Sequence, residues 1–278
     1  MKDEFCVKIF FTRIVVIKYD LHHILLKRKA IKQKLFNFLK ELIAPTRCAF
    51  CGYYGALFCE ECKIILEKIE PQCPVCRKPN DLYLTHSDCK KDFYLDSLVV
   101  CYEYNDVAKK LIESLKYKFD TSYAKILVDL MLENDSCLYY LEKNNNIVPV
   151  PLHEKRHKWR GFNQAELICD EIMKFVDKYT NLNIENDYIG IEKKDTKIIH
   201  LLIRTKNTVP QAKLKREKRL DNLKDAFDIN ESVEYGKIND VLIFDDVTTT
   251  TSTLNECAKV LKENGVKNVV GVVFARGV

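Results

Sequence analysis

Four close pairs of metal-ligating residues follow one another within a short part of this chain. Two residues separate the members of each pair, so one tight turn can direct both side chains at a single ion. Seven of the twelve cysteines belong to this set, which consists of Cys48 and Cys51, Cys59 and Cys62, Cys73 and Cys76, and His86 and Cys89. Eight ligands predict two tetrahedral zinc sites. Fully ligated zinc has no open position for water, so these sites are expected to be structural and not catalytic.

Spacing leaves two ways to distribute the pairs between two ions. Neighbouring pairs can share an ion, or alternate pairs can do so. Seven residues separate Cys51 from Cys59, and nine separate Cys76 from His86, which suits a short hairpin between neighbouring turns. We therefore favour the sequential arrangement. His86 is the least certain ligand by residue type, since it is the one member of the set that is not a cysteine.

A secreted disulfide scaffold would also be rich in cysteine, but such scaffolds are usually short and carry a signal peptide. The apolar stretch from Phe5 to Ile17 is broken by Lys8 and Arg13. It is shorter than the roughly 20 residues that a membrane span requires. We expect a cytoplasmic protein without a transmembrane segment. The remaining cysteines stand singly among apolar residues and are expected in the core: Cys6, Cys101, Cys137, Cys169 and Cys257.

The patterning divides the chain into three segments. Residues 1–44 end in a basic stretch with helical spacing, which we interpret as a helix packed on the body rather than one bound to a membrane or to nucleic acid. Residues 45–90 form the zinc-binding module, and residues 91–278 form an α/β domain. In that domain, strands are expected at 98–104, 147–151, 198–202, 241–244 and 269–274, and helices at 107–115, 123–132, 163–179 and 253–264. Such alternation predicts a mostly parallel sheet flanked by helices.

The most informative stretch of that domain is a buried strand, Val241–Phe244, followed by two acids and a hydroxyl-rich turn. Free backbone N–H groups at a strand-to-helix junction attract a phosphate, and adjacent hydroxyls donate hydrogen bonds to it. The paired carboxylates, Asp245 and Asp246, are suited to the vicinal hydroxyls of a ribose. A helix cap would account for one threonine or serine in the turn, but not for six in seven residues.

This stretch resembles the phosphoribosyl-pyrophosphate (PRPP) motif of type I phosphoribosyltransferases. In that resemblance, Asp245 and Asp246 match the ribose-binding acids, and the 5′-phosphate loop is matched by Thr249, Thr250, Thr251, Ser252 and Thr253. Thr251 stands where the family most often has glycine. Because glycine accommodates positive φ and a close backbone approach, this departure predicts an altered loop geometry or PRPP affinity.

Two further blocks resemble the ComF family of competence proteins. The first runs from Val148 to His153 and continues through Arg156 and Arg160–Glu166; the second consists of Thr208–Gln211, Leu214, Arg219, Asn222 and Phe227. The resemblance implies a phosphoribosyltransferase-like fold, PRPP bound with Mg²⁺, and a role in DNA uptake during natural transformation. The turn at 151–160 would be the pyrophosphate loop, and the basic segment 204–220 a mobile hood over PRPP.

Two functions from different classes fit these residues. In an enzyme, Arg156, Arg160 and Arg219 would stabilise the pyrophosphate that leaves as the phosphoribosyl group is transferred to an acceptor. In a binding protein, the PRPP site would be a sensor, and the basic surface would hold single-stranded DNA or a partner from the DNA-uptake machinery. The net charge of +5 permits a polyanionic partner without requiring one. Trp159, the single tryptophan, suits both base stacking and local packing.

Overall fold

The structure is a computed structural model that describes residues 45–117, 121–181, 195–206, 225–233 and 237–277. The chain divides into two compact units, Met1–Leu57 and Phe58–Val278. The basic helix expected within residues 1–44 lies outside the described residues. Within the described ranges, no helix is both long and apolar enough to cross a membrane.

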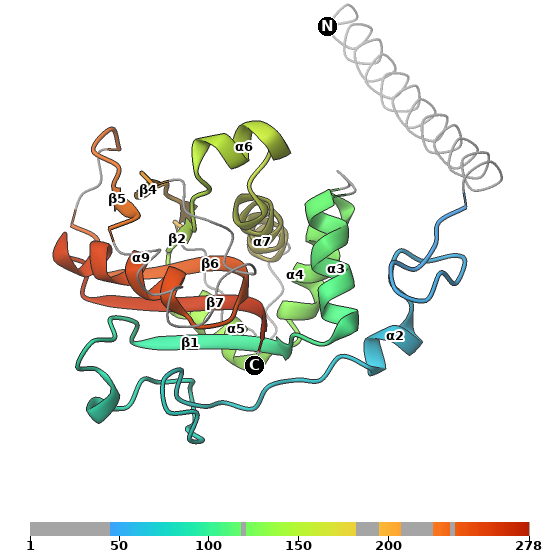
Figure 1. The fold of residues 1–278 in the computed structure, drawn as a ribbon, viewed down its shortest axis with the longest axis horizontal. Helices are drawn as coiled ribbons and strands as arrows, with labels where there is room; N and C mark the ends of the chain where they lie inside the picture. Colours follow the sequence, from blue (N-terminus) through green and yellow to red (C-terminus); the bar gives the residue numbers. More distant parts are fainter. Residues whose placement is uncertain (1–44, 118–120, 182–194, 207–224, 234–236, 278) are drawn as a thin grey trace, which may run out of the picture. The chain divides into compact units, whose positions relative to one another are not determined.

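A five-stranded sheet forms the centre of the second unit (Figure 1). Its strands run in the order β1 (Ser97–Glu103), β7 (Asn268–Arg276), β6 (Asp240–Thr248), β2 (Asn146–Pro149) and β3 (Lys197–Ile198). Every pairing in this sheet is parallel. Apolar residues fill the central strands, as expected for a sheet that is covered on both faces. The predicted α/β fold is confirmed.

Helices connect the parallel strands and cover the two faces of the sheet. Between β1 and β2 lie α3 (Asp106–Tyr117), α4 (Ser122–Met131) and α5 (Asp135–Lys143); α7 (Gln164–Asn181) follows β2, and α9 (Ser252–Glu263) follows β6. Since the chain moves in opposite directions along the sheet after β2 and after β6, right-handed crossovers place α7 and α9 on opposite faces. Both helices contact β6; α7 also packs on β2, β3 and α4, whereas α9 also packs on β7 and β5.

Three parts of the chain differ from the sequence expectation. The strand expected at 198–202 is split, because the β3 ladder stops at Ile199 and the N–H of Leu201 turns back to the Ile199 carbonyl, 3.0 Å away. The chain then forms β4 (Leu202–Arg204), which pairs antiparallel with β5 (Phe227–Ile229) in a separate small sheet. Residues expected as a pyrophosphate turn form α6 (Glu154–Arg160), and α5 was not anticipated.

The core of the second unit lies between the sheet and its helices. Phe244 and Phe274 are fully buried within it. Gly271 on β7 leaves room for a neighbouring strand, since a Cβ there would lie 2.8 Å from Leu98 Cδ1. Four of the isolated cysteines are buried as expected, namely Cys101, Cys137, Cys169 and Cys257; Cys6 lies outside the described residues.

The outer edge of β1 is covered by a segment that precedes the second ligand group and by one that lies between Cys76 and His86. On one side, Ile69 N–H donates to the Cys101 carbonyl at 3.2 Å, and Glu103 N–H donates to the Glu67 carbonyl at 2.8 Å. Farther along, Leu98 N–H donates to the Tyr83 carbonyl at 3.1 Å. These bonds use backbone groups that an edge strand would otherwise leave open.

Candidate functional site

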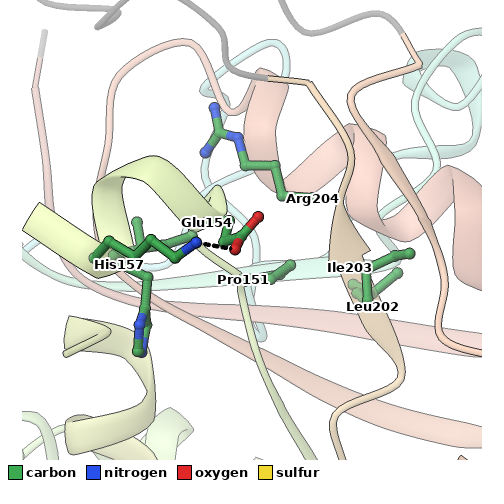
Figure 2. Close-up of a pocket in the computed structure, with 8 residues that line it drawn as sticks. Pro151, Glu154, His157, Leu202, Ile203 and Arg204 are labelled. Atoms are coloured by element: carbon green, nitrogen blue, oxygen red, sulfur yellow. Dashed lines mark ion pairs between the residues drawn. The ribbon is translucent and has the colours of Figure 1, made fainter. Parts of the chain in front are cut away.

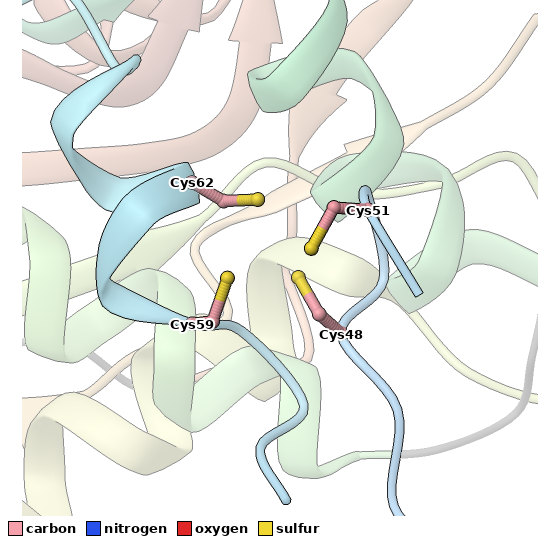
Figure 3. A group of neighbouring side chains, drawn as sticks. All are labelled: Cys48, Cys51, Cys59 and Cys62. Carbon is pink, nitrogen blue, oxygen red and sulfur yellow. The ribbon is translucent and has the colours of Figure 1, made fainter. Parts of the chain in front are cut away.

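The first cysteine cluster brings four thiols together (Figure 3). The sulfur atoms of Cys48, Cys51, Cys59 and Cys62 all lie within 4.8 Å of one another. A tetrahedral zinc ion with bonds of about 2.3 Å would hold its sulfurs roughly 3.8 Å apart, so this arrangement needs little adjustment. The turn after Cys48 closes with a hydrogen bond from Gly52 N–H to the Cys48 carbonyl at 3.1 Å.

A second cluster contains Cys73, Cys76, His86 and Cys89, again with ligand atoms within 4.8 Å of one another. His86 belongs to it directly, since its Nδ1 lies 3.3 Å from the Cys76 sulfur. Desolvation, together with the neighbouring thiols of Cys76 and Cys73, raises the pKa of Cys89 to about 11. A bound divalent cation would favour the thiolate forms instead.

The two clusters follow the sequential arrangement, with neighbouring pairs grouped together. Their donor sets are four sulfurs in one case, and three sulfurs with one imidazole nitrogen in the other. Both sets are typical of structural zinc, and the clusters are consistent with that metal. Every cysteine in the described part of the chain is free of disulfide bonds.

The other candidate site lies at the carboxyl edge of the sheet. After β6 the chain passes to β7 on one side, and after β2 it passes to β3 on the other. The strand order therefore reverses between β6 and β2, and ligands of open α/β sheets bind in the crevice at such a point. The motif residues that follow β6 and β2 are thereby placed at one edge.

Asp245 and Asp246 lie within β6, close to its carboxyl end at Thr248. Desolvation and the neighbouring Asp246 carboxylate raise the pKa of Asp245 to about 8. Asp246 is buried, and its Oδ2 forms an ion pair with the ammonium of Lys116, the penultimate residue of α3. Lys116 was not anticipated as a site residue, because its sequence neighbours give no sign that it reaches this acid.

The hydroxyl-rich turn connects β6 to α9. Thr249 and Thr250 lie in the turn, Thr251 is the N-cap, and Ser252 and Thr253 begin the helix. Thr251 has a φ of 60° and so adopts the left-handed conformation that favours glycine. The hydroxyls of Thr250 and Ser252 lie 2.7 Å apart. The turn thus places several hydroxyls beside the positive end of a helix.

Three arginines surround the same edge from α6 and β4. Desolvation and the charge of Arg160 lower the pKa of Arg156. Desolvation and the charge of Arg156 lower the pKa of Arg204, whereas Asp245 acts in the opposite direction. The charge of Arg156 is therefore felt by Arg204 and that of Arg160 by Arg156, an arrangement of cations that suits the binding of an anion. Arg219, the other predicted catalytic arginine, lies outside the described residues.

A pocket of about 340 Å³ opens between α6 and β4 (Figure 2). Its lining comprises Pro151, Leu152, Glu154, His157, Lys158, Leu202, Ile203 and Arg204. Glu154 and Lys158 form an ion pair of 2.5 Å on its α6 side. Sequence reasoning placed Arg204 only at the start of the hood. Its position on a short, separate strand could not be anticipated from the pattern of residues around it.

Comparison with known proteins adds to this geometry. No protein-family model matches the chain. Competence protein F from Haemophilus influenzae is 30% identical over 205 residues, which cover 72% of this chain and 82% of that protein. The chain belongs to the ComF family of competence proteins. The family expected from the sequence motifs is therefore confirmed.

Other relatives of this ComF-family chain extend the comparison. Competence protein ComFC from Bacillus subtilis is 27% identical over 218 residues, covering 74% of this chain and 78% of the relative. DNA utilization protein YhgH from Escherichia coli strain K12 is 29% identical over 235 residues, covering 81% and 94%.

Proposed function

We propose that this chain binds PRPP with Mg²⁺ at the carboxyl edge of its sheet and transfers the phosphoribosyl group to an acceptor. The observation that carries the proposal is the convergence of two acids, a hydroxyl-rich turn and several arginines at the reversal point between β6 and β2. Each group matches a different part of PRPP. The acids match the ribose hydroxyls, the turn matches the 5′-phosphate, and the arginines match the pyrophosphate.

Cations at the pyrophosphate end would lower the barrier to transfer. In the reaction, the bond between ribose C1 and pyrophosphate oxygen breaks, and pyrophosphate leaves with the electron pair. The acceptor's nucleophilic atom bonds to C1 and releases its proton to solvent. Arg156 and Arg204 would stabilise the charge that develops on the leaving group; the influence of Arg156 and that of Asp245 on Arg204 support this role. Mg²⁺ prefers oxygen ligands and would supply further positive charge there, held by PRPP oxygens and the carboxylates of Asp245 and Asp246.

The proposal places transfer in the context of DNA uptake, because relatives are named as competence and DNA utilization proteins. The same names support the second candidate function, a protein that binds single-stranded DNA or an uptake partner and uses PRPP as a signal. One observation favours it: α6 carries four basic residues, Lys155, Arg156, Lys158 and Arg160, against Glu154 alone, and most of that helix is exposed. DNA binding through this surface would weaken steeply with salt.

For the cysteine clusters we propose two structural zinc ions within a module of residues 45–90. The four-sulfur donor set supports one site, and the set with His86 supports the other. The remaining segments of the proposed organisation are residues 1–44 as an extension and 91–278 as the phosphoribosyltransferase-like domain.

Calorimetry with PRPP and Mg²⁺ tests the proposed site. Replacing both Asp245 and Asp246 with Ala removes two charge-assisted hydrogen-bonding groups, each worth about 1.5–3 kcal/mol, so the affinity should fall at least about tenfold. Asp228→Ala, which removes an exposed acid from β5, is the matched control and should bind as the wild type does. Equal affinities for the wild type and the double variant would refute the site. Release of pyrophosphate then distinguishes an enzyme from a sensor.

A further inference from the structure

Two exposed aromatic rings lie together at the end of α3 and on α6. Tyr117 is 54% exposed and Trp159 is 69% exposed. Their ring centroids are 6.4 Å apart, and their planes meet at 69°. Edge-to-face pairing stabilises such rings. Local packing of this kind leaves most of the tryptophan surface in water, so it does not account for a large apolar side chain at this position.

A guanidinium group lies against both rings. The Arg160 Cζ atom is 5.8 Å from the Tyr117 centroid and 5.9 Å from the Trp159 centroid. Arg160 is held in place by Gln164, because its Nη1 donates to the Gln164 Oε1 at 2.8 Å. The three groups together present two π faces and one planar cation, a combination that stacks well with planar heteroaromatic rings.

The same place holds hydrogen-bond donors without acceptors. Gln164 is only 3% exposed, yet its Nε2 has no hydrogen-bond partner among the described residues. The Nε of Arg160 is in the same situation. Leaving a buried donor unsatisfied destabilises the folded protein. Carbonyl and ring-nitrogen acceptors, which nucleobases carry on their edges, would satisfy these buried donors once the Arg160 and Gln164 side chains turn toward the ligand.

The aromatic pair adjoins the candidate ribose site. Tyr117 directly follows Lys116, whose ammonium forms the ion pair with Asp246. Arg156, one turn before Arg160 on α6, belongs to the cluster of cations at the same edge. A ligand stacked on these rings would therefore have its ribose or phosphate groups near the acids and arginines.

We propose that Tyr117, Trp159 and Arg160 form a platform for an unpaired nucleobase. Its occupant is either a free base, which accepts the phosphoribosyl group, or a base of single-stranded DNA. The acceptor role rests on the proposed transfer, whereas the stacking itself does not. Stacking on aromatic side chains contributes about 1–3 kcal/mol per base and tolerates different bases, since every base has a π face.

Trp159 is the only tryptophan in the chain, so intrinsic tryptophan fluorescence reports this platform directly. The full-length protein is titrated with adenine and with thymine, each with and without PRPP and Mg²⁺, and separately with a short oligothymidylate. We expect saturable quenching by at least one of these probes. Tyr117→Ala should weaken that binding about tenfold, in line with the loss of one stacking partner. Tyr139→Ala, which removes an exposed tyrosine on α5, is the matched control and should bind as the wild type does.

The arms of this experiment separate the two sources of the base. Quenching by a free base only when PRPP and Mg²⁺ are present supports an acceptor, whereas quenching by oligothymidylate without PRPP supports single-stranded DNA. No saturable quenching by any probe, or unchanged affinity in Tyr117→Ala, overturns the platform. Calorimetry with PRPP on the same samples tests the proposed transfer separately from the platform. If PRPP binds the wild type while no probe quenches, the platform alone fails; if oligothymidylate quenches while PRPP does not bind, the proposed transfer alone fails.

Discussion

Asp245→Asn should change how the stability of this protein depends on pH. In the folded protein, desolvation and the Asp246 carboxylate raise the pKa of Asp245 to about 8. In the unfolded chain, an aspartate has a pKa of about 3.9. Between these values the folded protein holds a proton that the unfolded chain has released. The stability contributed by this proton is fully present below the unfolded pKa and is lost as the pH rises through about 8.

A difference of one bound proton changes the free energy of unfolding by about 1.4 kcal/mol per pH unit. Between about pH 5.5 and about pH 7.5, Asp245 should therefore lower the stability of the wild type by roughly 2–3 kcal/mol. Asparagine does not ionise, so Asp245→Asn should remove this slope. Asp228→Asn, which changes an exposed acid on β5, should keep it.

Urea unfolding of zinc-saturated protein, followed by circular dichroism across that pH range, measures the effect. The other titrating groups are shared, but Asp246 interacts with Asp245, so the difference between wild type and Asp245→Asn reports the titration of the Asp245–Asp246 pair. Parallel pH profiles for these two proteins would refute the reasoning.

The protonation of Asp245 should also affect ligand binding. Ribose hydroxyls and Mg²⁺ favour the carboxylate, so PRPP binding near neutral pH should release about one proton, measurable by calorimetry in buffers of different ionisation enthalpy.

Three further changes test other parts of the structure. Thr251→Gly removes a β-branched residue from a left-handed conformation and should raise stability by about 1 kcal/mol in thermal unfolding, with PRPP affinity held or improved; a lower melting temperature would contradict this. Cys73→Ser should reduce the zinc content from about two to about one ion per chain by elemental analysis, and an unchanged content would count against that site. Lys116→Met leaves the buried Asp246 carboxylate without its ion pair and should cost about 3 kcal/mol in urea unfolding, whereas unchanged stability would show that the pair contributes little.

The fold could be predicted from sequence because its central strands are long and apolar. Val241–Phe244 and Val269–Phe274 are continuous buried runs, and the structure extends each of them by a few residues. By contrast, α6 has no buried residue, so no periodicity marks it. It is defined by its ends, where the His153 side chain accepts a hydrogen bond from Lys155 N–H and Gly161 adopts a positive φ.

Some residues of the candidate site could likewise be predicted from the sequence, and others could not. Candidate site residues that are adjacent in sequence, such as Asp245 and Asp246, were visible as a motif. The metal ligands were visible because their spacing is itself the signal. Lys116 and Arg204 reach the site from α3 and β4, and only the folded chain shows that they do so. The same holds for Tyr117, whose proximity to Trp159 depends on how α3 and α6 pack.

The covered edge of β1 bears on how the protein would behave without a metal at the second ligand cluster. Tyr83, whose carbonyl accepts the hydrogen bond from Leu98 N–H, lies in the stretch between Cys76 and His86. Because both ends of this stretch belong to the second ligand cluster, its order depends on that cluster. If metal loss released this stretch, the beginning of β1 around Leu98 would expose unpaired backbone groups, whereas the bonds of Cys101 and Glu103 to Ile69 and Glu67 lie outside that stretch. Such an edge recruits strands from other chains. Zinc at this cluster would then act as a safeguard against self-association, and starvation for the metal would show first as precipitation of the protein.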